Sequence, residues 1–332
     1  MVPNAFKATT IEGHLVLTFD GRLSLHDVKT DLKSGDSIEL QDGARAPESS
    51  LSRAQALSWL LTNGMRVNTF GALKDEEPRI ISGHQPSYHG YIPLFCKVAA
   101  SDVFSIADDL SFGRQKFQHR QRLVTPSGTK WLTVPVCKSA SRSTIRAKSP
   151  NYSTDWQTNH WQLICKAFEK LKYFDTYADY YEAVYRVQWN SLAALDEALW
   201  MAMTSELAPN TVSLCSSNLD FDKSGKKGDR IAAELSLFRG GGYYLAGAAS
   251  DYLTSKSYQH QDLTYVEVIE SKGFAVLKCA LDEEKFRRST ATPVTAAAME
   301  LVAREGKDAS AILRDSTRLS HFVTQPHHVE NG

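Results

Sequence analysis

Two kinds of hydrophobic pattern alternate along residues 79–320 and predict strands that are followed by helices. Short apolar runs have the length of buried strands, at residues 80–81, 103–106, 211–214 and 243–245. Longer segments have apolar residues three or four positions apart, as amphipathic helices do, at residues 92–100, 155–172 and 187–207. This alternation is typical of a parallel sheet covered by helices. We therefore expect an α/β domain with a mostly parallel sheet and flanking helices over residues 79–320.

A β-hairpin insertion is predicted inside this domain at residues 116–136. Two apolar runs, 122–124 and 131–134, flank the sequence Pro126-Ser127-Gly128-Thr129. Proline and glycine stand there at positions that turns prefer. The connection that follows, residues 138–150, is rich in serine, threonine and basic residues, and we expect it to close over a ligand.

The two ends of the chain differ from this domain in pattern. Residues 1–76 predict a small separate α+β unit, with strands at 14–19 and 37–40 and an amphipathic helix at 50–63. Residues 74–78 read as a linker. The last residues, 321–332, are expected to form a flexible tail.

Composition narrows the class of protein. The 332 residues are 42% hydrophobic and 23% charged, as in soluble globular proteins, and no apolar run is long enough to cross a membrane. The N-terminus lacks the layout of a secretion signal. Five scattered cysteines without a CxxC pair argue for reduced thiols and against a zinc site or disulfides. We expect a cytoplasmic protein (in the host cytoplasm if the source is viral) without a membrane partner.

Charge is distributed unevenly, although the 38 basic and 38 acidic residues balance. Residues 111–150 contain nine Lys or Arg and no Asp or Glu, so the rest of the chain carries a net charge of −9. A solvated basic hairpin would explain this segment. We favour an anion-binding surface for phosphate, pyrophosphate or nucleic acid, because the basic run begins directly after the loop described next.

The candidate chemistry centres on the loop Ser82-Gly83-His84-Gln85-Pro86-Ser87-Tyr88-His89-Gly90-Tyr91. It connects a predicted strand to a predicted helix, and such loops bind ligands in α/β proteins because the free N–H groups of a helix start attract anions. His84 and His89 can stabilise a leaving phosphate through charge-assisted hydrogen bonds; alternatively, one of them braces the loop.

Three further positions carry candidate roles. Lys97, in the following helix, either reaches the ligand or extends into solvent. Asp108, just after the second strand, is a candidate general base, with loop capping as the alternative. Arg120 and Arg122 alternate along a predicted strand, so both face the same side and can bind phosphate oxygens.

No established catalytic motif for another chemistry is present: there is no P-loop, Gly-x-Ser-x-Gly, His-Glu-x-x-His or Gly-x-Gly-x-x-Gly. No ligand spacing supports a metal site. We therefore predict no cofactor, although the sequence does not exclude a divalent metal.

Several short motifs follow one another at characteristic spacings along the chain: Gly83-His84-Gln85-Pro86, Asp102-Val103-Phe104, Phe117 to Arg122, Trp131 to Val136, Ser216-Ser217 and Tyr244 to Gly247. In their order and spacing, these motifs resemble the WbqC-like family over roughly residues 79–265. Residues 90–95 and His119 depart from the usual family pattern. Together with the basic run, these motifs give as candidate catalytic residues His84, Asp108 and Lys97. The candidate substrate-binding residues are Gln85, Tyr88, His89, Lys116, Arg120, Arg122, Trp131, His160, Arg230 and Gly247.

The resemblance implies an enzyme that modifies surface-polysaccharide sugars. The loop is also faintly similar to the Thr-Gly-Gln-Gln motif of the cysteine-adding enzyme of bacillithiol synthesis, which joins an amine to a second molecule. We therefore expect a transferase in which a small amino acid such as glycine displaces phosphate or pyrophosphate from an activated carbon.

Two molecules are candidate acceptors of the amine. The first is a phosphorylated hydroxymethyl pyrimidine in DNA, as in phages that hypermodify thymidine. The second is a nucleotide-activated sugar of O-antigen biosynthesis. The basic segment suits DNA. The neutral overall pI of about 7.1 weighs mildly against DNA, although a single basic face is enough to bind it. A non-enzymatic anion-binding or nucleic-acid-binding protein is the third alternative. The expected partners are DNA, or the nucleotide sugar, and a free amino acid.

Overall fold

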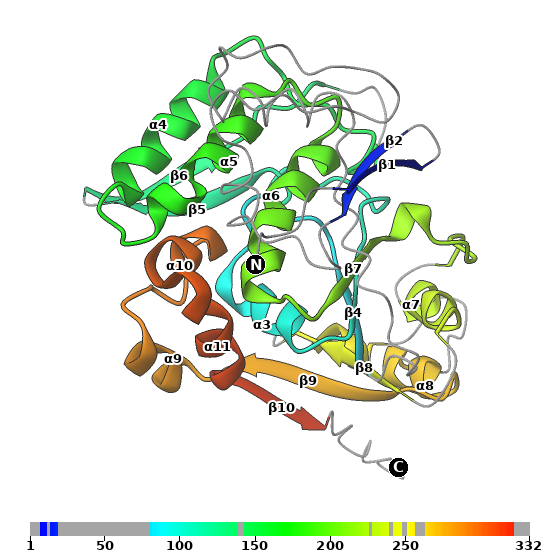
Figure 1. The fold of residues 1–332 in the computed structure, drawn as a ribbon. Helices are drawn as coiled ribbons and strands as arrows, with labels where there is room; N and C mark the ends of the chain where they lie inside the picture. The colour runs from blue at the N-terminus through cyan, green and yellow to red at the C-terminus, as the bar shows by residue number, and fades with distance from the viewer. Residues whose placement is uncertain are drawn as a thin grey trace, which may run out of the picture.

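The fold is described by a computed structural model of the chain (Figure 1). The description covers residues 7–11, 14–18, 80–125, 127–138, 143–225, 228–238, 242–247, 251–255 and 263–321. In the first two ranges the strands β1 (Lys7–Ile11) and β2 (His14–Thr18) pair in antiparallel orientation. The strand predicted at 14–19 corresponds to β2. The strand predicted at 37–40, the helix at 50–63 and the linker at 74–78 lie outside the described residues, as does the predicted tail beyond His321.

A six-stranded sheet forms the centre of the domain, in the order β10-β9-β8-β3-β4-β7. Its strands are β3 (Ile80–His84), β4 (Val103–Ile106), β7 (Val212–Cys215), β8 (Tyr243–Ala246), β9 (Ala275–Leu281) and β10 (Thr317–His321). Every neighbouring pair is parallel except β9 and β10. The predicted mostly parallel α/β sheet is therefore confirmed.

Alternating side chains of the strands face two separate hydrophobic clusters. Val103 of β4 and Tyr244 of β8 join the smaller cluster, whereas their neighbours Phe104 and Leu245 join the larger one. This is the two-residue period of a strand that is buried on both faces. The face of the sheet with the smaller cluster is covered by helices α7 (Gly228–Leu235) and α8 (Tyr265–Glu270) and by the 3-10 turn η2 (Asp251–Thr254). Figure 1 shows α7 and α8 on one side of the sheet and α3, α6, α10 and α11 on the other.

The larger cluster contains side chains from seven helices that are spread along residues 92–315. They are α3 (Ile92–Ala99), α4 (Trp156–Phe168), α5 (Phe174–Arg186), α6 (Leu192–Leu207), α9 (Glu283–Ser289), α10 (Ala298–Glu305) and α11 (Ala309–Asp315), with the 3-10 turn η3 (Gly306–Asp308) between the last two. The tyrosines of α5 lie in this core. Among the described residues, no helix combines the length and apolar character needed to cross a bilayer.

Two helix boundaries differ from the prediction. The pattern predicted a single helix from Val187 to Leu207, but Val187 is extended and α6 begins only at Leu192. Ser191 ends the connection, because its hydroxyl accepts a hydrogen bond from the backbone N–H of Ala194 (3.1 Å) and so caps the new helix. Similarly, α4 ends at Phe168, although the apolar period continues to residue 172.

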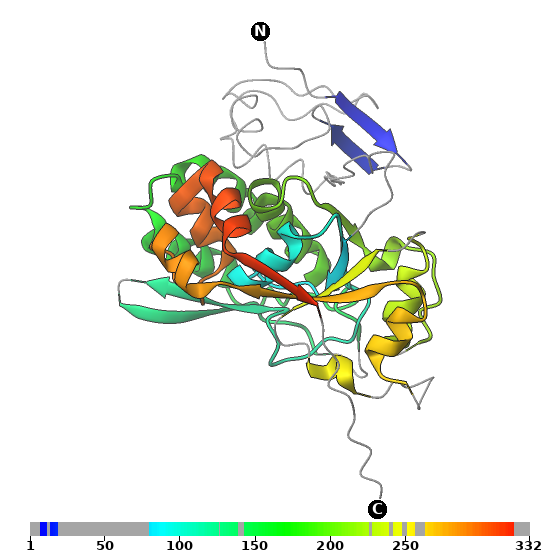
Figure 2. The ribbon, with the colours of Figure 1, turned by 90° about the horizontal axis from the view of Figure 1, so that it is seen from below.

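The predicted hairpin is also present, as β5 (Arg120–Thr125) and β6 (Gly128–Thr133) paired in antiparallel orientation. It extends away from the sheet, as the second view shows (Figure 2). Gly128 has a φ of 105° in the turn, a conformation in which glycine is strongly preferred. The elements after residue 270, which include β9, β10 and α9 to α11, had not been predicted from the pattern.

Candidate active site

The candidate site lies where the parallel strands β3, β4 and β7 end. His84, Ile106 and Cys215 stand opposite one another in the register, so the residues that follow them meet at one edge of the sheet. Asp108 and Asp109 follow β4, and the 3-10 turn η1 (Ser216–Asn218) follows β7. This is the edge at which open α/β sheets bind ligands.

The loop after β3 is tightly constrained. His89 and Gly90 both adopt left-handed backbone conformations, with φ values of 56° and 52°. Tyr91 then opens α3, and Pro93 stands in its first turn, where proline fits because the N–H has no helical partner. The loop reverses the chain between β3 and α3 and fixes His84 at the strand end.

His84 is half-buried and neutral. Its Nδ1 donates to the carbonyl oxygen of Gln85 (2.7 Å), which assigns the proton to Nδ1 because a carbonyl only accepts. Burial, reinforced by the charge of Lys97, lowers the pKa of His84 to about 4. Its Nε2 therefore keeps a lone pair at neutral pH, and the hydroxyl of Tyr91 lies 3.4 Å away. A neutral imidazole of this kind can accept a proton.

Lys97 is buried directly behind this strand end. Its ammonium donates to the carbonyl oxygen of Gly83 (2.6 Å) and lies 5.9 Å from the ring centre of Tyr244. Burial lowers the pKa of Lys97 to about 8. A Cβ atom built on Gly247 would lie 4.0 Å from Lys97 Cδ, so the end of β8 adjoins the same side chain. The structure thus brings together three predicted site residues, His84, Lys97 and Gly247.

Asp108 is fully buried and doubly bound. One carboxylate oxygen accepts from Arg146 (2.8 Å), and the other accepts from the backbone N–H of Ser217 (3.0 Å). The same guanidinium nitrogen of Arg146 also donates to the Ser217 hydroxyl (2.8 Å). The hydrogen bond to Asp108 raises the pKa of Arg146, whose side chain is 38% exposed. Asp108 therefore holds a partly exposed cation at the sheet edge, an arrangement that suits the positioning of Arg146.

A second carboxylate–arginine pair lies beside the first. Asp109 accepts from Arg230 and from the hydroxyl of Ser216, both at 2.6 Å. Burial alone would raise the pKa of Asp109, but these hydrogen bonds and the Arg230 charge outweigh it and lower the pKa. Arg230, predicted to bind an anion, is thus paired with a carboxylate and also lies over the ring of Phe221 (5.0 Å). Lys226 and Lys227, which the sequence grouped with it, lie outside the described residues.

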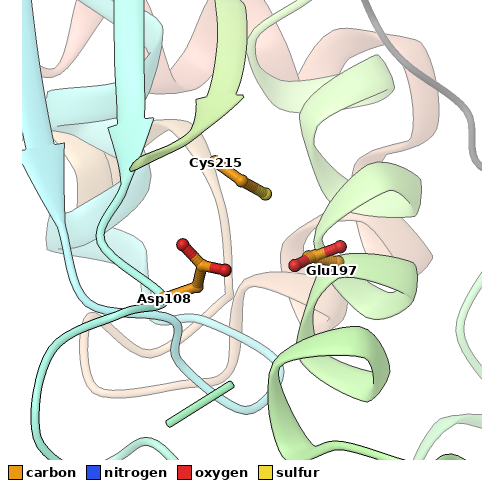
Figure 3. A group of neighbouring side chains, drawn as sticks. All are labelled: Asp108, Glu197 and Cys215. Atoms are coloured by element: carbon orange, nitrogen blue, oxygen red, sulfur yellow. The ribbon is translucent and has the colours of Figure 1, made fainter. Parts of the chain in front are cut away.

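Three side chains near this edge offer ligand atoms for a metal. The carboxylates of Asp108 and Glu197 and the thiol of Cys215 approach within 4.8 Å of one another, with Glu197 contributed by α6 (Figure 3). Burial raises the pKa of the Cys215 thiol, and the charge of Glu197 adds to this effect. A metal here would compete with the bond from Arg146 to Asp108. Sequence spacing did not indicate this group, because its members come from β7, α6 and the end of β4.

Four aromatic side chains form a buried network under the loop. The Tyr88 hydroxyl lies 2.8 Å from His160 Nδ1 and 2.5 Å from the Tyr185 hydroxyl, which also bonds His89 Nε2 (2.6 Å). Burial lowers the pKa of His89 to about 3 and that of His160 to about 4. Three predicted substrate-binding residues, Tyr88, His89 and His160, are thus brought together, in the interior rather than at the surface.

The basic hairpin is tied to the loop by hydrogen bonds. Gln118 Nε2 donates to Gln85 Oε1 (2.7 Å), and the N–H of Tyr88 donates to the carbonyl oxygen of Phe117 (2.9 Å). The side-chain amide of Gln121 also donates to the carbonyl oxygen of Gly90. These contacts hold the hairpin in a fixed position beside His84.

Two predicted arginines of this hairpin surround one tryptophan. The guanidinium carbons of Arg120 and Arg122 lie 4.6 and 5.7 Å from the ring centre of Trp131, which is 48% exposed. Arg122 stands opposite Trp131 in the strand register, so the predicted common face is present. Lys116 is exposed in the connection that precedes the hairpin.

Arg146 and Ser217 are the main contributors that the predicted site residues did not include. Ser217 lies three residues after the end of a predicted strand, which is a usable signal. Arg146 lies 38 residues from Asp108, inside a serine-rich connection, and nothing local in the sequence joins the two.

Comparison with known proteins gives a family and one distant relative. A family model described as the WbqC-like protein family matches residues 85–276, and the chain therefore belongs to that family. The uncharacterized protein Rv1507c of Mycobacterium tuberculosis is 28% identical over 155 residues, which are 46% of this chain. The match spans 64% of that relative's own length. No solved structure matches at a significant level.

Proposed function

We propose that this member of the WbqC-like family is a transferase that couples the amine of a small amino acid, glycine in the simplest case, to a phosphate-activated hydroxymethyl pyrimidine in DNA. One observation carries the proposal. A neutral imidazole, that of His84, and the cations of Lys97 and Arg146 lie at the ends of adjoining strands at one sheet edge. Amine transfer with loss of phosphate needs a proton acceptor and cationic groups of this kind.

The proposed step balances without a redox change. The lone pair of the amine nitrogen attacks the exocyclic carbon of the pyrimidine and forms a C–N bond. The C–O bond to phosphate or pyrophosphate breaks, and the leaving group departs with the electron pair. The ammonium product then loses a proton to His84 Nε2, whose basicity rises when the anionic leaving group lies beside it. Lys97, which is mostly protonated at neutral pH given a pKa of about 8, and Arg146 stabilise the charge of the leaving group.

This assignment changes two roles that the sequence suggested. His84 was predicted to stabilise the leaving phosphate by charge-assisted hydrogen bonds, but burial keeps its imidazole neutral. Asp108 was predicted as the general base, but Arg146 and the N–H of Ser217 already occupy both of its carboxylate oxygens. Within the proposal, Asp108 is a positioning residue for Arg146 and His84 accepts the proton.

The DNA acceptor is favoured by the surface next to the site. Residues 111–150 carry nine basic residues without an acidic one, and the hairpin presents an exposed tryptophan flanked by two arginines. Such a combination suits phosphates and bases. A nucleotide-activated sugar is the second candidate acceptor, because it offers the same diphosphate to Arg146. An anion-binding or nucleic-acid-binding protein without activity is the third reading.

Mass spectrometry of nucleosides tests the proposal. The protein is incubated with glycine and DNA that contains phosphorylated 5-hydroxymethyluracil, and the DNA is then digested. We expect a new nucleoside that carries the amino acid. The variant His84→Gln should abolish it, whereas His321→Gln on the exposed edge strand β10 should not.

Two outcomes would redirect the proposal. No product with any of several amino acids, on verified substrate, together with transfer to a nucleotide sugar, would favour the second acceptor. Equal yields from wild type and His84→Gln would remove His84 from the reaction.

A further inference from the structure

We infer that the aromatic line formed by Trp131, Phe117 and Tyr91 binds unpaired nucleotides of a DNA strand by stacking and leads toward His84. The inference rests on the proposed function, because it supplies that site with its DNA contact. It also makes a separate claim: the partner is a single strand or an unstacked base rather than an intact duplex.

The line is continuous from the surface to the candidate site. The ring centres of Trp131 and Phe117 are 6.1 Å apart, and those of Phe117 and Tyr91 are 5.5 Å apart. Tyr91 meets His84 edge to face at 6.2 Å, with its hydroxyl 3.4 Å from Nε2. Exposure falls along this path, since Trp131 is exposed and Phe117, Tyr91 and His84 are each half-buried.

Trp131 forms the exposed end of the line. Trp131 is one of a few large hydrophobic side chains in the described part of the chain that are strongly exposed, at 48%. Its cross-strand neighbour is an arginine rather than an apolar residue. A side chain that covers base faces would account for that position, since base–aromatic stacking is tolerant of sequence.

Charge along the line identifies the partner as a polyanion. Arg120 and Arg122 lie over the Trp131 ring, and Arg120 is further fixed by donating to the carbonyl oxygen of Gln115 (2.8 Å). Residues 111–150 contain no Asp or Glu, so this segment carries only positive charge. Cations that alternate with aromatic rings are the combination that single-stranded nucleic acids need, with phosphates on the cations and bases on the rings.

The line also has a fixed geometry relative to the site. The Gln118–Gln85 bond, the bond from Tyr88 N–H to the Phe117 carbonyl and the Gln121–Gly90 contact join the hairpin to the loop that holds His84. A nucleotide stacked near Tyr91 would therefore present its base to His84 without a large rearrangement. A base inside a duplex cannot lie there, because its faces are covered by its neighbours.

Binding measurements on the full chain test the inference without any need for catalysis. The probe is a fluorescently labelled oligothymidylate of roughly 12 nucleotides, within the usual site size of such proteins. Trp131→Ala is expected to weaken binding by roughly tenfold or more, and Phe117→Leu by a smaller factor. Arg122→Ala should weaken binding and reduce its dependence on salt concentration. A labelled duplex of the same length should bind more weakly than the single strand.

Matched controls separate this surface from general effects of exposed residues. Leu319→Ala removes another exposed apolar side chain, 44% exposed on β10, and Arg314→Ala removes an exposed charge on α11. Neither should change the affinity. Thermal melting identifies any variant that fails to fold, and Trp131→Phe, which keeps an aromatic face, should retain most of the binding.

The outcomes distinguish this inference from the proposed function. Unchanged oligothymidylate affinity in Trp131→Ala and Phe117→Leu would overturn the inference, even if the transfer product forms. So would binding of the duplex alone, or of nucleotide sugars with no DNA binding. Loss of binding in both variants without any transfer product would support the inference and leave the proposed reaction refuted.

Discussion

The ammonium of Lys97 lies 2.6 Å from the carbonyl oxygen of Gly83, the residue that precedes His84. A buried lysine therefore holds the end of strand β3 next to His84, the candidate base. The pairing is a charge-assisted hydrogen bond to a neutral carbonyl, so it offsets only part of the cost of burying the charge. This explains why the pKa of Lys97 falls to about 8, and it links the stability of the domain to the chemistry of the site.

Lys97 should make the protein more stable as pH rises from about 8 to about 10.5. In that range the unfolded chain still binds the lysine proton and the folded chain does not, so raising the pH favours the folded state. Lys97→Met lacks this titration. The difference in unfolding free energy between wild type and variant should change by up to about 3 kcal/mol across the range. Urea titrations at several pH values measure it; parallel curves for the two proteins would contradict the burial of a charged Lys97.

His89 and His160 should make the protein less stable in mild acid. Their pKa values are lowered to about 3 and about 4, so the unfolded chain binds protons from about pH 6.5 downward while the folded chain does not. Stability should fall between about pH 6.5 and about pH 4. In His160→Gln, this acid-induced loss of unfolding free energy should be smaller, by at most roughly 3 kcal/mol. The hydrogen bond between the hydroxyls of Tyr88 and Tyr185 stays in place in this variant. His321→Gln, exposed on β10, is the control; an equal flattening in both would refute the assignment.

Gly90→Ala should destabilise the fold more than Gly273→Ala. Both glycines have positive φ values, 52° and 86°, so alanine strains the backbone at either position by about 1 kcal/mol. At Gly90 the added Cβ would also lie 2.5 Å from the Phe95 ring, whereas nothing lies within 4 Å at Gly273. The clash should add roughly 1–3 kcal/mol. Denaturant unfolding of both variants measures the difference, and similar losses would show that the loop relaxes freely.

Arg146→Ala should reduce both stability and activity. The change leaves the fully buried carboxylate of Asp108 with the Ser217 N–H as its remaining described partner. Because Arg146 itself is 38% exposed, we expect a loss of about 2–3 kcal/mol rather than the full cost of a buried unpaired charge. The exposed pair Arg287–Glu283 is the control: Arg287→Ala should cost less than about 1 kcal/mol. Double-mutant cycles with Asp108→Asn measure the coupling, and a value near zero would exclude the positioning role.

Several features were determined by the sequence alone. The strand–helix alternation, the hairpin at 116–136 and the loop between β3 and α3 were predicted because each depends on a local period or on turn residues. The family was also identifiable from short motifs in order, and the match over residues 85–276 confirms it. The start of α6 was placed too early because a serine cap interrupts an apolar period that otherwise continues.

The tertiary structure decided which side chains meet. Ser217 and Arg230 reach Asp108 and Asp109 because β7 pairs with β4, more than a hundred residues earlier in the chain. Arg146 reaches Asp108 from the connection after the hairpin, where its backbone N–H also donates to the carbonyl oxygen of Asp108 (2.9 Å). Likewise, sequence placed His84 and His89 in one loop, but packing left His84 half-buried beside Tyr91 and enclosed His89 with Tyr185. Local periodicity fixes secondary structure, whereas the order of strands in a sheet and the burial of a side chain follow from contacts between distant segments. Those contacts set the charge state of each candidate residue.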